Sequence, residues 1–162
     1  MHLDSKHTEA KTATTREIFP PSNWKHVLTL LGLIIVADKK VLKEEVDAYL
    51  DSVTELQAVI DPTVSLTRKM AQDWFMLNKP RLLEIIDSLA YDTALLETLH
   101  PIKSMPHKLD VISAMVRIGV SDGVYSDVER GLVKKTILYW NIPASPKISV
   151  DPTEAKLRLT SA

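Results

Sequence analysis

The amino-acid sequence predicts an all-α protein of about six or seven helices. Apolar residues recur at steps of three and four along most of the chain, which is typical of helices with one buried face. No segment shows the sustained apolar-polar alternation of a β-strand. A chain of 162 residues without cysteine is long enough to bury a core without disulfides or a structural metal. We therefore expect one helical domain over residues 22–142, with a flexible tail at 1–21 and an extension at 143–162.

The first predicted helix begins after Pro20 and Pro21, with Ser22 as its N-cap, and ends near Asp38. It contains the most apolar stretch of the chain, VLTLLGLIIVA. At 11 residues this stretch is too short for the ~20 residues that a bilayer-spanning helix needs. The sequence therefore predicts a helix that is buried in the protein on all sides.

A second helix is predicted after a short link at 39–42, and Asp61 and Pro62 end it. Its expected buried face consists of six apolar residues, Val46, Tyr49, Leu50, Val53, Leu56 and Ile60. Residues 63–78 and 80–99 are predicted as two further helices, because a proline such as Pro80 is tolerated in a first helical turn.

The rest of the domain is expected to hold a loop and two more helices. Residues 100–107 contain two prolines and are predicted as the loop. The helices are predicted from about Leu109 to Ser121 and from about Asp127 to Trp140. One extra helical turn is expected near residues 153–159.

The chain resembles itself when it is shifted by 84 residues. The shift superimposes six apolar pairs and also pairs Asp38 with Asp122 and Glu45 with Glu129. Both copies then consist of an apolar helix, an acidic residue at its end, a short turn, and an amphipathic helix with a glutamate in its first turn. This pattern indicates an internal duplication of a helix-loop-helix unit, in which the two apolar helices pack against each other at the centre.

Composition excludes several functional classes. With 20 basic and 21 acidic residues the net charge is -1, so no positive field draws in nucleic acid. The absence of cysteine excludes thiolate catalysis and cysteine-based zinc sites, and it fits a cytoplasmic protein. Four glycines leave little material for a P-loop or a dinucleotide-binding turn, and no such motif occurs. The sequence therefore favours a protein that is not an enzyme.

The second acidic turn, IGVSDGVYSDVE at residues 118–129, resembles TerB-like domains of the tellurite-resistance family. The first turn, IIVADKKVLKEE at 34–45, is a weaker echo of the same motif, and QDWFMLNKP at 72–80 is similar to a segment of some bacterial members. The resemblance covers about residues 22–142. It implies an all-α fold and a bacterial cytoplasmic protein linked to tellurite resistance or stress. It also implies a divalent cation held by acidic residues, but it supplies no reaction.

The four paired acids are the candidate metal ligands. Carboxylate oxygens suit Ca²⁺ and Mg²⁺, and an Asp before a turn and a Glu after it can point at one volume. We expect Asp122 and Glu129 to form the stronger half of the site and Asp38 and Glu45 the weaker half, because Lys39 and Lys40 would repel a cation. Glu44 and Asp127 offer additional oxygens, and Ca²⁺, Mg²⁺ and Zn²⁺ all stay open as the ion.

The same residues also fit a purely structural role. Gly123 follows a helix end, and Ser126 with Glu129 has the spacing of a capping box, in which each side chain binds the other's backbone amide. The first copy has Lys39 and Leu42 at the corresponding positions, so the caps are lost there while both acids are retained. This retention favours metal ligation.

Two functional hypotheses follow from the sequence. In the first, a stress-linked TerB-like protein binds a divalent cation. In the second, a non-catalytic module presents a helical surface to a partner protein, and the acids serve only as caps. The oligomeric state stays open, as does a metal shared by His100 and His107, although solvated loop histidines are commoner. The aromatic residues are expected to anchor helix packing.

Overall fold

The structure is a computed structural model that describes residues 22–63 and 66–143. These residues form six α-helices and one 3₁₀ turn and contain no strand, which confirms the predicted all-α class. The helices are α2 (Ser22–Val36), α3 (Lys43–Ile60), α4 (Arg68–Asp87), α5 (Tyr91–Leu99), α6 (Lys108–Val120) and α7 (Asp127–Tyr139), and the turn η1 (His100–Ile102) follows α5. The extra turn expected near 153–159 and the tail at 1–21 lie outside the described residues.

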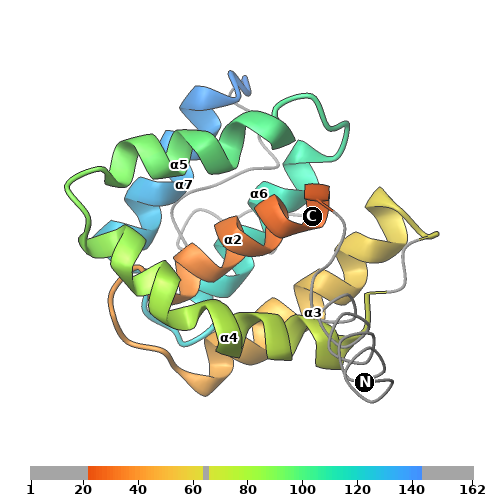
Figure 1. The fold of residues 1–162 in the computed structure, drawn as a ribbon, viewed down its shortest axis with the longest axis horizontal. Helices are drawn as coiled ribbons and strands as arrows, with labels where there is room; N and C mark the ends of the chain where they lie inside the picture. Colours follow the sequence, from red (N-terminus) through yellow and green to blue (C-terminus); the bar gives the residue numbers. More distant parts are fainter. Residues whose placement is uncertain (1–21, 64–65, 144–162) are drawn as a thin grey trace, which may run out of the picture.

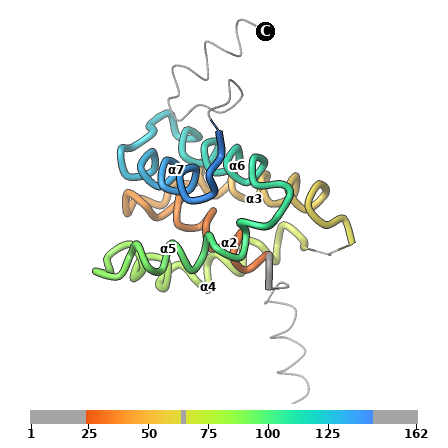
Figure 2. Tube along the Cα trace, turned by 90° about the horizontal axis from the view of Figure 1, so that it is seen from above, coloured from red at the N-terminus to blue at the C-terminus, as the bar shows by residue number. Residues whose placement is uncertain are grey.

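The helices pack in two layers around α2. Helices α4 and α5 flank α2 in one layer, and α3, α6 and α7 lie in the other (Figures 1 and 2). From Val27 to Ala37 every side chain is buried, as the apolar stretch predicts. No helix among the described residues is both long and apolar enough to cross a bilayer.

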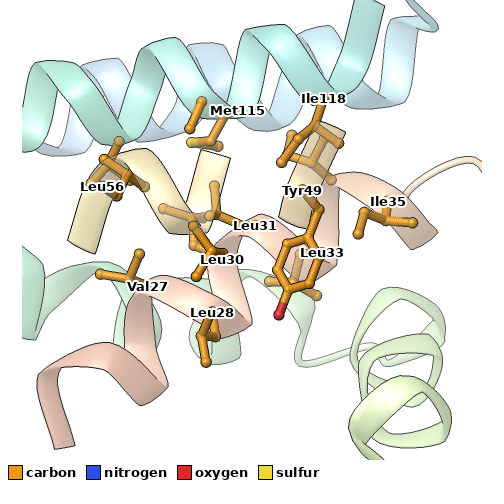
Figure 3. Packing of buried hydrophobic residues seen from close by; sticks show 14 of the residues in the cluster. Val27, Leu28, Leu30, Leu31, Leu33, Ile35, Tyr49, Leu56, Met115 and Ile118 are labelled. Atoms are coloured by element: carbon orange, nitrogen blue, oxygen red, sulfur yellow. The ribbon is translucent and has the colours of Figure 1, made fainter. Parts of the chain in front are cut away.

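Helices α2 and α6 are in contact, as predicted for the two apolar helices, although α2 packs more extensively against α4. Figure 3 shows Leu31 of α2 below Met115 of α6, while Leu28 points to the opposite side of α2. Helix α6 differs from α2 in having an exposed face, which includes Ser113 and Arg117. From Val27 onward α2 is therefore enclosed on all sides, whereas α6 covers it with one face only.

Aromatic side chains anchor this packing. Trp24, Trp74, Phe75 and Trp140 are all at most 3% exposed, which confirms their predicted role. The indole of Trp140 donates a hydrogen bond to the carbonyl of Leu99 (2.9 Å), and this bond joins the end of α7 to the end of α5.

The predicted helix break before Pro80 is wrong. Helix α4 continues through Pro80 to Asp87, and the break comes at Ser88–Ala90. Pro80 is exposed, while Trp74, Phe75 and Leu82 bury one continuous face on both sides of it. The burial of that face outweighs the local preference of proline to end a helix, because the missing amide lies on the solvent side.

Replacing Pro80 by alanine is expected to stabilise the protein by about 1–3 kcal/mol, since alanine restores the amide hydrogen that a helix interior uses. Urea unfolding should show a higher midpoint for Pro80→Ala, while the neighbouring Lys79→Ala should stay within about 0.5 kcal/mol of the wild type. A lower midpoint for Pro80→Ala would mean that α4 requires the proline geometry.

Candidate metal centre

Two short turns bring the acidic residues into the molecule. The turn at 37–42 joins α2 to α3, and the turn at 121–126 joins α6 to α7. In each turn an aspartate carboxylate accepts a hydrogen bond from the amide two residues later, from Lys40 to Asp38 (3.0 Å) and from Val124 to Asp122 (2.9 Å). The next residue after each aspartate has a positive φ, 64° at Lys39 and 83° at Gly123.

The backbone hydrogen bonds of the two turns also correspond at a distance of 84 residues. The amides after each aspartate donate to the last residues of the preceding helices, Lys39 to Val36 and Gly123 to Val120. The first bonds of the following helices match as well, since Val46 donates to Leu42 and Arg130 donates to Ser126. The two acidic turns therefore have the same local backbone structure.

Three carboxylates from the two turns converge on one volume. Asp38, Glu45 and Glu129 each place an oxygen within 4.8 Å of the other two. Glu45 and Glu129 are only 1% and 0% exposed. Both glutamates are the third residue of their helix, so the first turns of α3 and α7 aim them at the same place.

None of the four carboxylate oxygens of Glu45 and Glu129 makes a hydrogen bond of normal geometry within the described residues, although the Leu42 amide and the Ser126 side chain lie close enough to influence the charges of Glu45 and Glu129. A buried ionised carboxylate without a partner is strongly destabilising, and such groups are normally paired or coordinate a metal. At 4.8 Å two ionised carboxylates repel each other by roughly 3–4 kcal/mol at an effective dielectric constant near 20. The arrangement therefore requires a proton or a cation.

The pKa values of both glutamates are raised accordingly. Burial raises the pKa of Glu45 to about 8, with further contributions from the charges of Asp38, Glu129 and Asp122, while the Leu42 amide opposes a part of the shift. Burial likewise raises the pKa of Glu129 to about 7; Ser126 opposes this shift, and Asp38 and Asp122 add to it. Near neutral pH these two groups hold protons that a cation would have to displace.

Asp122 lies near this cluster but outside the 4.8 Å group. It is half-buried, and its charge reaches both glutamates. The group thus brings Asp38, and not Asp122, together with Glu129 and Glu45. The additional oxygens considered at Glu44 and Asp127 belong to exposed residues outside the group.

The repulsion that Lys39 was expected to exert on a bound cation is reduced, because its positive charge is paired with a carboxylate outside the cluster. The ammonium group of Lys39 forms an ion pair with Asp87 at the end of α4 (2.5 Å). This pairing binds the positive charge to a carboxylate outside the cluster.

The capping-box interpretation is only half correct. The Ser126 hydroxyl accepts a hydrogen bond from the amide of Glu129 (3.2 Å), so Ser126 is the N-cap of α7. The reciprocal bond from the Ser126 amide to the Glu129 carboxylate is absent, because both carboxylate oxygens are unpartnered. Leu42 makes no side-chain cap, as predicted. Capping therefore explains Ser126 but does not explain the carboxylates of Glu45 and Glu129.

The two loop histidines contact different residues. Nδ1 of His100 lies 2.9 Å from the Tyr139 hydroxyl, and Nδ1 of His107 lies 3.3 Å from the Asp110 carboxylate. Neither histidine belongs to the group of residues that could hold an ion in the described part of the chain.

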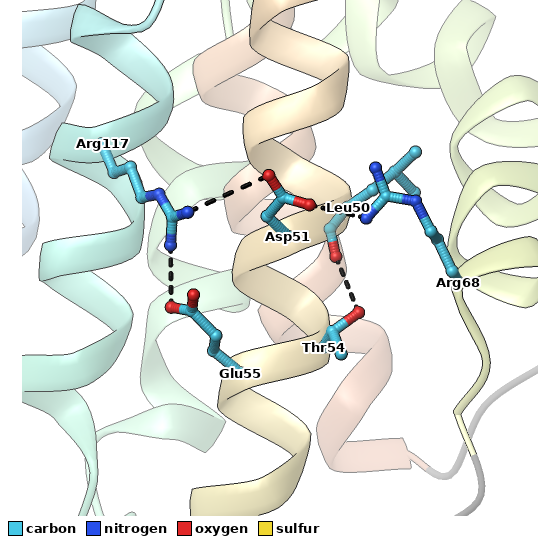
Figure 4. Close-up of polar contacts among 6 residues, drawn as sticks. All are labelled: Leu50, Asp51, Thr54, Glu55, Arg68 and Arg117. Carbon is cyan, nitrogen blue, oxygen red and sulfur yellow. Dashed lines mark hydrogen bonds and ion pairs between the residues drawn. The ribbon is translucent and has the colours of Figure 1, made fainter.

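A second polar cluster lies on the surface between α3, α4 and α6 (Figure 4). Arg68 binds Asp51 (2.7 Å), and Arg117 binds Glu55 (2.7 Å) and approaches Asp51 (3.9 Å). These residues line an open cleft of about 650 Å³. Because each arginine already has a carboxylate partner, the cluster serves to link the helices, and exposed pairs of this kind contribute little to stability.

Comparison with known proteins adds no assignment. No family model matches the chain, and neither a curated protein nor a solved structure matches it. The chemistry of the acidic cluster is therefore inferred from its own residues.

Proposed function

We propose that this chain is a TerB-like, stress-associated protein that binds a divalent cation through Asp38, Glu45 and Glu129. The observation that carries the proposal is the pair of fully buried glutamates without hydrogen-bond partners, which converge with Asp38. An ion would satisfy these oxygens and remove their mutual repulsion.

The donor set favours a hard cation. All three ligands are carboxylates, and hard ions such as Ca²⁺, Mg²⁺ and Mn²⁺ prefer oxygen donors, whereas Zn²⁺ is commonly held by nitrogen or sulfur. Asp122 lies close enough for its charge to act on both glutamates.

The correspondence of the two turns supports an internal duplication and the resemblance to TerB-like domains. The paired hydrogen bonds and positive-φ residues recur at the spacing at which the acids recur in sequence. In this interpretation the two copies contribute jointly to one site, which explains why the first copy retains its acids although it lacks the serine cap and the glycine.

Calorimetric titration of the chelator-treated protein with Ca²⁺, Mg²⁺, Mn²⁺ and Zn²⁺ tests the proposal. The wild type should bind one of these ions saturably, and the double variant Asp38→Asn, Glu129→Gln should not bind it. Glu44→Gln is the matched control, because it removes an exposed carboxylate beside Glu45 and should leave binding unchanged. Flat titrations with all four ions would refute the proposal.

A link to tellurite or oxidative stress is a separate part of the proposal, carried by the sequence resemblance alone. It predicts that cells without the protein become more sensitive to tellurite and that the wild-type chain restores resistance. If the Asp38→Asn, Glu129→Gln variant restored resistance equally well, the cation site would be unrelated to that role.

A protein-binding role is the second candidate, favoured by an apolar groove between α5 and α7. Its volume is about 470 Å³, and its lining is Asp92, Leu95, Leu96, Leu99, Lys135, Leu138 and Tyr139. Leu96 and Leu138 are both exposed in this groove, at 45% and 77%, and neighbouring exposed apolar side chains, unlike a single one, are typical of protein-binding surfaces. If this role is correct, Leu138→Lys should abolish capture of a partner and leave cation binding unchanged.

A further inference from the structure

Gly119 of α6 lies directly against the candidate metal centre. A Cβ atom at this position would lie 3.1 Å from Oε2 of Glu129 and 2.8 Å and 3.0 Å from two ring carbons of Tyr125. Distances below 3.0 Å are essentially absent from real proteins, so any side chain at 119 would force a neighbour to move. The bare backbone of α6 is thus the surface on which the carboxylate and the tyrosine ring both rest.

The tyrosine ring has little freedom to move away from this surface. Tyr125 is buried, and the guanidinium of Arg130 lies over its ring, 5.2 Å from the ring centroid. Arg130 is itself held by a hydrogen bond from Nη2 to the Tyr125 carbonyl (3.1 Å). A side chain at position 119 would therefore displace both the Tyr125 ring and the Glu129 carboxylate.

The first acidic turn carries different residues at the corresponding positions. At the positions 84 residues earlier, Gly119, Tyr125 and Arg130 are replaced by Ile35, Val41 and Val46. In the first copy the larger side chain, Ile35, is on the helix and the turn carries Val41. In the second copy the helix carries Gly119 and the turn carries the larger Tyr125. The two glutamates of the cluster are consequently placed by different packing.

We propose that Gly119 is a positioning residue that, with Tyr125 and Arg130, fixes the Glu129 carboxylate as the preformed ligand of the cation. This inference rests on the proposed cation site. Groups that orient metal ligands typically affect affinity 10- to 100-fold when they are changed. Gly119 would then determine affinity although it carries no ligand atom.

The test is the cation affinity of Gly119→Ala, measured by calorimetry with the ion that the wild type binds best. We expect affinity at least tenfold below that of the wild type. Gly131→Ala is the matched control, because it introduces the same methyl group into α7 with no atom within 4 Å, and it should bind normally. If Gly119→Ala binds as tightly as Gly131→Ala, the inference is wrong while the cation site stands.

A double variant separates positioning from general loss of packing. Tyr125→Val, the residue type of the first turn, removes the ring that a methyl group at 119 would strike and leaves only the contact with Glu129. The melting temperature of Gly119→Ala, Tyr125→Val should return to that of Tyr125→Val alone. Its cation affinity should stay about tenfold below that of Tyr125→Val. Equal affinities of these two variants would show that Gly119 merely makes room for the ring. A wild type that binds no ion would refute the proposed function itself.

Discussion

The double variant Glu45→Gln, Glu129→Gln is expected to lose all stabilisation by a divalent cation and to be more stable than the metal-free wild type at pH 8. Glutamine has nearly the same shape as glutamate, so it preserves packing while it removes two buried charges. Its amide group also donates hydrogen bonds, and the Asp38 carboxylate belongs to the same group and offers an acceptor.

The expected size follows from binding linkage. A cation at 100 times its dissociation constant stabilises the folded wild type by about 2.7 kcal/mol. For a chain of 162 residues this corresponds to a rise in melting temperature of roughly 5–10 °C. Thermal unfolding with added ion and with chelator measures the difference, and Glu97→Gln, which removes an exposed carboxylate on α5, should keep the full rise. A double variant that gains as much as the wild type would show that ions act elsewhere on the protein.

The overall fold was predictable from the sequence because helix periodicity and turn residues agree in most places. The ends of α3, α6 and α7 lie within one or two residues of the predictions, since Asp61-Pro62 and the two acidic turns interrupt the apolar pattern clearly. Helix α4 was mispredicted because proline is a strong local signal, whereas the burial that overrides it depends on contacts with distant residues. The actual break carries no glycine or proline, only Ser88, Leu89 and Ala90.

The residue types of the candidate site could be predicted from the sequence, but their arrangement could not. The shift by 84 residues identified Asp38, Glu45, Asp122 and Glu129 as a group. The packing of α3 and α7 against α2 and α6 determines which three of these four carboxylates come together. No local sequence pattern encodes that packing. The capping box had the correct spacing, but the Glu129 side chain turns into the core, where Gly119 leaves room for it.

The metal-free protein is expected to lose stability as the pH rises from 5 to 9, the reverse of what most carboxylates cause. The pKa values of Glu45 and Glu129 in the folded protein are about 8 and about 7, against 4.5 for a free glutamate, so the folded state binds more protons than the unfolded state. Their protonated forms stabilise the fold fully below pH 4.5, and this contribution is lost as the pH rises through 7 and 8.

Each unit of pKa difference corresponds to about 1.4 kcal/mol, so the loss should amount to a few kcal/mol for each of the two glutamates across this range. Urea unfolding in chelator at several pH values measures it, and the Glu45→Gln, Glu129→Gln variant should show a much flatter profile. Saturating cation should reverse the trend, because the ion binds the deprotonated carboxylates and competes with protons. If the metal-free wild type instead became more stable between pH 5 and pH 8, the pKa values of the two glutamates would be lowered in the folded protein, and the cluster would hold no destabilising repulsion for a cation to relieve.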